Sequence, residues 1–184
     1  MPNITLIPFV DDDCSRLLGW IQSRGMLIQW AGPIQFVYPL TVDQLREYAK
    51  ESTIDNGTRK IFKAVAENGE TIGHLEFGAI HREQKTAVLC RVLVVPDARG
   101  RGLCTPMIRK GLSIGFRELQ LRRIELRVYG FNTTAIRCYE KAGFVREGLL
   151  RQTVMVEQEC WDTVVMAILR EEWEHISVKN VDPC

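Results

Sequence analysis

The sequence has no stretch of about 18 uninterrupted apolar residues, the length at which a membrane-spanning helix is expected. Its first residues, MPNITLIPFVDDDC, lack the basic, apolar and small-residue succession of a secretory signal. Internal repeats, low-complexity tracts and linkers rich in Gly, Ser and Pro are also missing. We therefore expect residues 1–184 to form one cytoplasmic domain that does not enter a membrane.

Patterns of cysteine and histidine that hold metals are absent too. The 6 cysteines form no C-x-x-C pair and have no histidine at metal-ligand spacing. The acidic run from Asp11 to Asp13 has no further ligand cluster with it and is typical of the start of a helix. We expect reduced, mostly structural cysteines and no metal site.

A large excess of one charge is also missing, since the formal net charge is +1. Residues 97–127 nevertheless carry 8 Lys and Arg against 3 Asp and Glu, which leaves +5, whereas residues 145–184 carry 4 against 8, which leaves −4. A chain so near neutrality lacks the basic balance of proteins that bind the phosphate backbone of nucleic acids. We expect no nucleic-acid partner and a compact anion as the ligand of the basic segment.

What the sequence does contain is an alternation of strand and helix patterns, typical of a mixed α/β sheet with helices packed on it. Asn68-Gly69 between two strand-like runs predicts a hairpin within residues 60–80. The nearly continuous apolar run 87–95 is typical of a central strand covered on both faces. Further strands are predicted at 3–9, 122–130, 149–157 and 163–169, and helices at 11–22, 41–52, 107–120 and 132–143.

The span VVPDARGRGLCTP, residues 94–106, joins the central strand to a helix. Gly100 and Gly102 would let an anion approach the unpaired amides of a helix N-terminus, and Arg99 and Arg101 add formal charge. Thr105 is a candidate cap for that helix. The span is neither a Walker A loop, which needs Gly-Lys before Ser or Thr, nor a G-x-G-x-x-G dinucleotide loop.

Arg99, Gly102 and Cys104 resemble motif A of the GNAT superfamily of acetyl-CoA-dependent N-acetyltransferases, in which Gly or Ala usually stands where this chain has cysteine. The segment NTTAIRCYEKAGFVREG, which begins at Asn132, is similar to the second landmark of that family, and WDTVVMAILREEW resembles the closing strand of its RimJ/RimL branch. The resemblance implies a single-domain α/β GNAT-like fold. Its mixed, mostly antiparallel sheet would have about six or seven strands, splayed at the cofactor site, with helices on both faces.

The resemblance also divides the domain and gives residues their roles. The cofactor-binding core would span about 60–170 and the acceptor-side helices and loops about 10–60, with 26–41 as a variable substrate loop. Tyr139 would be the general acid for the departing thiolate of CoA, and Asn132 would hydrogen-bond the pantetheine region. The remaining cofactor contacts would be Val92, Leu93 and Val94 for the pantetheine arm and Arg99, Gly100, Arg101, Gly102, Leu103, Cys104 and Thr105 for the pyrophosphate. Each role has a structural alternative: core packing for Val92 to Val94 and Tyr139, and a helix N-cap for Asn132.

Acetyl transfer requires a neutral amine, and therefore a base or an amine of low pKa. The strand 87–95 carries no carboxylate, so Glu76 on the hairpin is the nearest candidate base; a solvated strand-face carboxylate and an ordered water as base are the alternatives. Deprotonation at pH 7 costs roughly 4.6 kcal/mol for a lysine-like amine and roughly 1 kcal/mol for an α-amine. This difference favours a protein or peptide N-terminal α-amine as acceptor.

Two other functions stay open on the sequence alone. One is acetylation of a small molecule such as a polyamine, amino acid or aminoglycoside, since Glu157, Glu159 and Asp162 of the acidic segment could attract any cationic acceptor. The other is a non-catalytic acyl-CoA-binding sensor. The sequence also leaves open whether two copies associate as a homodimer.

Overall fold

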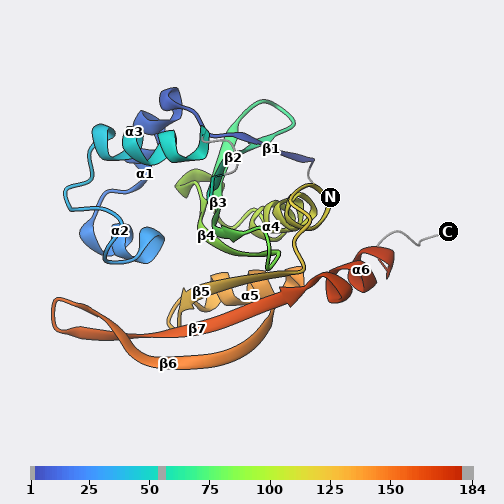
Figure 1. Cartoon of the computed structure of the whole chain (residues 1–184). Coiled ribbons are helices and arrows are strands. Elements are labelled where there is room, and N and C mark those ends of the chain that lie inside the picture. The colour runs from blue at the N-terminus through green and yellow to red at the C-terminus, as the bar shows by residue number, and fades with distance from the viewer. Residues whose placement is uncertain (1–2, 54–56, 180–184) are drawn as a thin grey trace.

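The computed structural model describes residues 3–53 and 57–179 (Figure 1). Seven strands form one sheet in the order β1-β2-β3-β4-β5-β7-β6. Their bounds are β1 Ile4–Pro8, β2 Lys60–Ala66, β3 Thr71–His81, β4 Thr86–Val94, β5 Arg123–Tyr129, β6 Val145–Val156 and β7 Glu159–Leu169. Every neighbouring pair is antiparallel except β4 and β5, which are parallel. The predicted mixed, mostly antiparallel sheet is confirmed.

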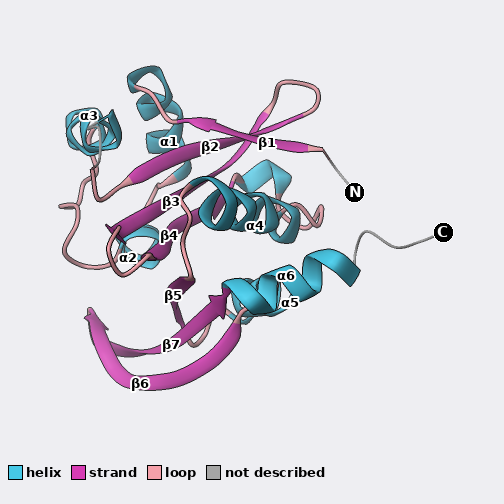
Figure 2. Ribbon diagram, turned by 45° about the vertical axis from the view of Figure 1, so that its right-hand side comes forward, coloured by secondary structure: helices cyan, strands magenta, loops and turns pink. Residues whose placement is uncertain are grey.

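The helices are α1 Cys14–Trp20, α2 Arg24–Ala31, α3 Val42–Lys50, α4 Cys104–Ser113, α5 Thr133–Ala142 and α6 Arg170–Lys179. Short 3₁₀ turns cover Asp11–Asp13, Glu51–Thr53 and Pro96–Ala98, and a π-helical segment, Ile114–Glu118, continues α4. In Figure 1, α1, α2 and α3 gather on one side of the molecule. Figure 2 shows α4 lying across β3 and β4, with α5 and α6 beside β5 and β7. None of the described helices is both long and apolar enough to span a membrane.

The alternation of side chains along β3 explains why helices cover both faces of the sheet. One face carries Gly73, where an added Cβ would come within 2.6 Å of the sulfur of Met107 in α4. The opposite face carries His74 and Glu76, which meet Tyr48 of α3. Two layers of helices therefore bury β3, whereas the sequence predicted a strand covered on both faces at 87–95, in the neighbouring β4.

Glycines let α4 and its continuation approach the sheet closely, as their spacing predicts. A Cβ added at Gly115 would lie 2.6 Å from Cδ1 of Ile124, and one at Gly111 would lie 3.4 Å from Cδ2 of Leu75. Real Cβ atoms do not approach neighbours to 2.6 Å, so a larger residue at Gly115 would push the helix off β5.

The parallel strands β4 and β5 pair over only three positions, Thr86 to Val88 against Arg123 to Glu125. Beyond Val88 they continue without pairing, so the sheet splays there, as expected. On its other edge β4 has a bulge. Cys90 pairs with Glu76 of β3 and Leu93 pairs with His74, so β4 has one more residue than β3 between these two pairs. The splay and the bulge both expose the backbone of the end of β4.

Most predicted elements are present with shifted ends, and the expected hairpin turns at Gly69, whose φ is +83°. Two expectations are wrong, and one helix was not predicted. Residues 26–41 are not a loop throughout, because α2 runs to Ala31 from a cap in which the Ser23 side chain accepts from the Met26 amide. Thr105 does not cap α4, which begins at Cys104 after Leu103. The chain also ends its described part in α6, which no pattern predicted.

Candidate functional site

A cavity of about 610 Å³ opens where β4 and β5 separate. Its walls come from the end of β4, the following loop, the start of α4, and α5. They include ten of the residues predicted to bind cofactor or act in catalysis: Val92, Leu93, Val94, Arg99, Gly100, Gly102, Leu103, Cys104, Asn132 and Tyr139. Arg101 and Glu76 do not line it.

Helix α2 and its approach close the other side of this cavity with residues that the sequence analysis gave no role in the site. These are Ile21, Met26 and Gln29, of which the last two were expected only as part of a substrate loop at 26–41, and they join Trp30, whose indole is buried. The signal for them was weak, because apolar residues in a short helix near the N-terminus are also what any core requires.

The loop after β4 has the conformation that an anion-binding turn needs. Gly100 and Gly102 have φ values of +74° and +73°, a left-handed region that other residues adopt only with strain, and added Cβ atoms there would meet open space. Arg99 folds back, with its Nε donating to the carbonyl of Val94 at 3.1 Å. The first amides of α4 follow directly and supply unpaired N–H groups with a partial positive charge.

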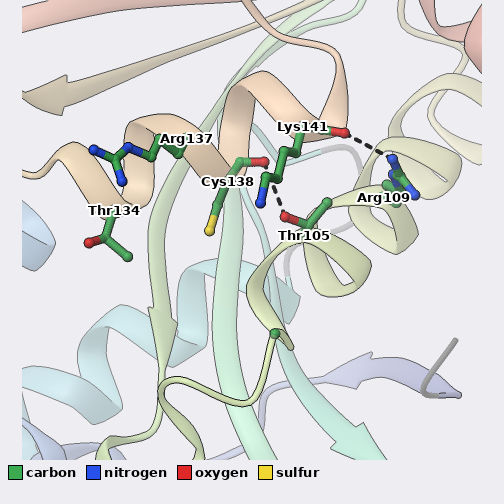
Figure 3. A pocket seen from close by; sticks show the side chains of 7 residues that line it. Thr105, Arg109, Thr134, Arg137, Cys138 and Lys141 are labelled. Carbon is green, nitrogen blue, oxygen red and sulfur yellow. Dashed lines mark hydrogen bonds between the residues drawn. The ribbon is translucent and has the colours of Figure 1, made fainter.

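A second cavity of about 470 Å³ continues the first between α4 and α5 (Figure 3). It shares Gly102, Thr134 and Cys138 with the first cavity, so the two form one groove. Its other lining residues are Thr105, Arg109, Arg137 and Lys141.

Three cations and no acid therefore line this end of the groove, among the described residues. Arg109 donates from Nη2 to the carbonyl of Lys141 at 2.9 Å, and Thr105 donates to the carbonyl of Cys138 at 3.4 Å, which ties the two helices together (Figure 3). The sequence analysis missed Arg109 and Arg137 as site residues. The four-residue spacing of Arg137 and Lys141, which places both on one face of α5, was the available signal.

Tyr139 reaches the first cavity from the buried side of α5. Its ring packs edge-on against Phe144 with centroids 5.8 Å apart. Burial raises the pKa of its hydroxyl above the ordinary value, and the thiols of Cys104 and Cys138 nearby add to the effect. Among the described residues none hydrogen-bonds to that hydroxyl, and burial keeps it protonated and available as a proton donor.

Asn132 is the N-cap of α5, where its Oδ1 accepts from the Ala135 amide at 3.2 Å. The structural alternative for this residue is therefore present. The cap uses only the carbonyl oxygen of the side chain, so the amide nitrogen keeps two donors at the wall of the cavity. A cap and a ligand contact are compatible in one residue.

Glu76 is fully buried, so the alternative of a solvated strand-face carboxylate is wrong. Arg59 and Arg91 form ion pairs with its two oxygens at 2.8 and 2.7 Å, and the Tyr48 hydroxyl donates to it at 2.7 Å. Its neighbour on the same face, His74, lies 3.0 Å from the Tyr48 oxygen. Burial, and then the charge of Arg91, lower the pKa of His74 to about 3, so its ring is neutral.

Three aromatic rings gather at the end of β5, near α2. Tyr129 stacks with Phe131 at 5.9 Å, and Trp161 of β7 meets both rings edge-on at 5.0 and 4.9 Å. The Tyr129 hydroxyl donates to the carbonyl of Ile28 in α2 at 3.4 Å, and the Trp161 indole donates to Glu159 at 3.4 Å. Exposed aromatic faces beside a carboxylate attract organic ammonium ions.

Metal-ligand clusters of three or more His, Cys, Asp or Glu are absent from residues 3–53 and 57–179. Within the same ranges the cysteines Cys14, Cys90, Cys104, Cys138 and Cys160 are free thiols. Burial raises the pKa of the Cys104 thiol, and Cys138 beside it adds to the shift. The Cys104 thiol therefore offers the groove a neutral wall.

Comparison with known proteins gives the same family as the sequence motifs. The model of the acetyltransferase (GNAT) family matches residues 26–144. The SPbeta prophage-derived uncharacterized N-acetyltransferase YokL of Bacillus subtilis is 30% identical over 137 residues, which cover 74% of this chain and 76% of that protein. The spermidine N(1)-acetyltransferase of Vibrio cholerae is 28% identical over 131 residues, 71% of this chain and 75% of that protein.

Among solved structures, the fold is similar to that of spermidine N-acetyltransferase from Vibrio cholerae in complex with CoA and spermine. The TM-score is 0.82 at 24% identity, and the match covers 93% of this chain and 98% of that one. The seven-stranded mixed sheet with its splay therefore has the architecture of a CoA-binding acetyltransferase.

Proposed function

The chain belongs to the acetyltransferase (GNAT) family and is an acetyl-CoA-dependent N-acetyltransferase, and from this premise we propose that its acceptor is a small cationic amine, a polyamine first of all. Membership of a family of N-acetyltransferases favours an enzyme over a sensor that only binds acyl-CoA. What remains to be argued is how the groove holds the donor, which group moves the proton, and which amine is acetylated.

The continuous groove between the splayed strands and α5 is the observation that carries the proposal. Its inner part is walled by the backbone and side chains of Val92 to Val94, which suits the extended pantetheine arm. The loop from Gly100 to Gly102 and the start of α4 suit the pyrophosphate. The cationic end, with Arg137 and Lys141, suits the remaining phosphate of acetyl-CoA.

In this arrangement the amine attacks the thioester carbonyl, and the thiolate of CoA leaves. The Tyr139 hydroxyl gives its proton to that thiolate, since burial keeps it protonated at the wall of the cavity. The Asn132 amide donates to the pantetheine region. The acceptor loses its ammonium proton to water before the attack, because Glu76 is enclosed by two guanidinium groups, and the second nitrogen proton, released as the amide forms, passes through water to restore the Tyr139 hydroxyl.

The acceptor that the α-amine argument favoured, a protein N-terminus, is less well supported than a small molecule. A relative and a solved structure that resemble this chain are named for spermidine. The aromatic rings of Tyr129, Phe131 and Trp161 beside Glu159 also suit a cationic chain. The RimJ/RimL-like branch and its N-terminal acceptors stay a prediction from residues 161–173.

Mass spectrometry of the products tests the acceptor directly. The protein is incubated with acetyl-CoA and a pool of spermidine, spermine, aminoglycosides, amino acids and short peptides. We expect acetylated polyamine as the main product. Acetylation of peptide α-amines with untouched polyamines would reject the small-molecule proposal, and acetylation of an aminoglycoside alone would keep the small-molecule class but replace the polyamine.

A further inference from the structure

A buried carboxylate lies behind the strand that lines the groove. Glu76 is 0% exposed and sits on β3, opposite Cys90 in the register with β4. Arg59 and Arg91 contact its two oxygens at 2.8 and 2.7 Å, and the Tyr48 hydroxyl is a third donor at 2.7 Å. The guanidinium groups also flank the Tyr48 ring, with Cζ atoms 5.4 and 5.5 Å from its centroid. One buried anion thus gathers donors from Arg59 just before β2, from β4 and from α3.

Arg91 connects this cluster to the cofactor groove. It is the residue of the β4 bulge, with φ of +50°, directly before Val92. A left-handed conformation in a residue other than glycine is strained and persists only when the surroundings hold it. Val92, Leu93 and Val94 line the groove immediately after this strained point. The path of the strand along the groove therefore depends on how Arg91 is held.

The structure holds Arg91 from both ends. Its guanidinium is fixed by Glu76 and by the side-chain oxygen of Gln35, which accepts from Nη2 at 3.0 Å. Its carbonyl accepts from the Trp30 indole of α2 at 2.9 Å. Trp30 itself is stacked on Phe36 at 5.5 Å. Contacts from α2 and from the segment between α2 and α3 meet at the bulge together with the carboxylate.

We infer that Glu76 is a positioning residue, which through Arg91 fixes the bulge of β4 and so the backbone of Val92 to Val94 along which acetyl-CoA lies; this rests on the proposed use of the groove. The geometry opposes a role as base. Glu76 does not line the groove, and its two oxygens already face two cations and a hydroxyl donor. A base needs a lone pair within reach of the amine.

The test compares Glu76→Gln with a matched variant, Asp13→Asn. Asp13 is also a buried carboxylate with two cations, Arg16 at 2.7 Å and Lys63 at 2.8 Å, but its hydrogen bonds and ion pairs within the described residues do not reach β4. Binding of acetyl-CoA is measured by calorimetry without any acceptor, together with thermal unfolding. We expect both variants to lose stability and only Glu76→Gln to weaken acetyl-CoA binding, by roughly tenfold.

Kinetics separate positioning from catalysis. Positioning predicts a raised KM for acetyl-CoA with kcat at saturation and its pH profile little changed in Glu76→Gln. A base predicts a fall in kcat of about 10²-fold or more and loss of the acidic limb of the profile. That second result, or acetyl-CoA affinity equal to that of the wild type, would overturn the inference.

A milder variant keeps the inference testable if Glu76→Gln does not fold. Gln35→Met keeps the length of the side chain but removes the acceptor of Arg91 Nη2, and Gln35 does not line the groove. It should also raise the Kd for acetyl-CoA, by roughly threefold or more, and an unchanged Kd would count against the inference. If the wild-type protein binds no acetyl-CoA, the proposed function is wrong as well. If the wild type and the variants bind acetyl-CoA equally well, the inference alone is wrong.

Discussion

At the scale of single residues, the groove depends on groups whose neighbours restrict them to one protonation state. Burial keeps the Tyr139 phenol and the Cys104 thiol protonated, since it raises the pKa of both. Of these, the Tyr139 hydroxyl is the stronger hydrogen-bond donor, because a thiol S–H donates only weakly. A departing thiolate needs a proton there, and Arg99 is the one lysine, arginine or histidine among the described residues that line this cavity.

Replacing Tyr139 with Phe should separate chemistry from binding. The ring keeps its edge-on packing with Phe144, so acetyl-CoA affinity should stay within about twofold of the wild type. Loss of the acid should lower kcat by about 10²- to 10⁴-fold, measured by single-turnover product formation. Tyr38→Phe is the control, because it removes a phenol hydroxyl from an exposed residue that does not line the groove. Unchanged turnover in Tyr139→Phe would refute the assignment.

The residues that sequence could identify are those whose role is local. Gly100 and Gly102 were predicted because a turn before a helix needs their positive φ, and Gly143 ends α5 in the left-handed conformation expected of it. Glu76 was named as the nearest candidate base, but its partners were not predicted. Arg59, Arg91 and Tyr48 lie far from it in sequence, and nothing local says that they converge.

At the scale of elements, α5 contributes four residues to the groove. It begins at the Asn132 cap, places Tyr139 on its buried side, and carries Arg137 and Lys141 on the wall of the second cavity, where Lys141 points toward Thr105 of α4 (Figure 3). The helical period fixes these directions, because residues four apart share a face and Tyr139 falls between two such positions. A substitution of Arg137 or Lys141 should therefore change how the donor's phosphates are bound and leave the Tyr139 acid in place.

The cations of α5 should recognise phosphate rather than the whole donor. The double variant Arg137→Gln, Lys141→Gln should weaken binding of acetyl-CoA by roughly tenfold and leave that of acetyl-pantetheine nearly unchanged, because only the former presents phosphates. Isothermal titration with both donors measures the difference. Arg151→Gln, an exposed cation on β6, controls for lost net charge. Equal losses for both donors would show that the variant disturbs the helix instead.

Elements differ in how much of them the sequence could predict. The hairpin, β4, β5 and α5 carry strong local signals: a turn dipeptide, an apolar run, alternation, and a cap with a terminal glycine. Helix α2 was missed because its apolar residues serve two surfaces, with Leu27 in the core and Met26 at the cavity, and so give no single stripe. Helix α6 was missed because Trp173, against Phe116 at 5.2 Å, is its one buried side chain in the described range.

At the scale of the whole molecule, the face of β3 that carries His74 and Glu76 joins the acceptor-side helices to the cofactor strand. His74 is fully buried between the rings of Phe9 and Trp30, 5.1 and 5.6 Å away. The titratable and charged groups that act on it come from three other elements: Tyr48 of α3, Arg91 of β4 and Asp13 of the first 3₁₀ turn. Burial is the largest influence, and with Arg91 it lowers the pKa of His74 to about 3.

Acid should therefore destabilise the fold well above the range in which carboxylates titrate. The folded state leaves His74 neutral down to pH about 3, whereas the unfolded chain protonates it near its ordinary pKa of 6.5, so the unfolded state binds more protons in between. The free energy of unfolding should fall by up to about 2 kcal/mol from pH 7 to pH 5 through this residue. Urea unfolding at several pH values measures the slope. His74→Gln should flatten it whatever its own stability, while His81→Gln, at an exposed position, should not. A slope that survives in His74→Gln would mean that another group carries the acid sensitivity, and that the buried face of β3 tolerates a charged imidazole.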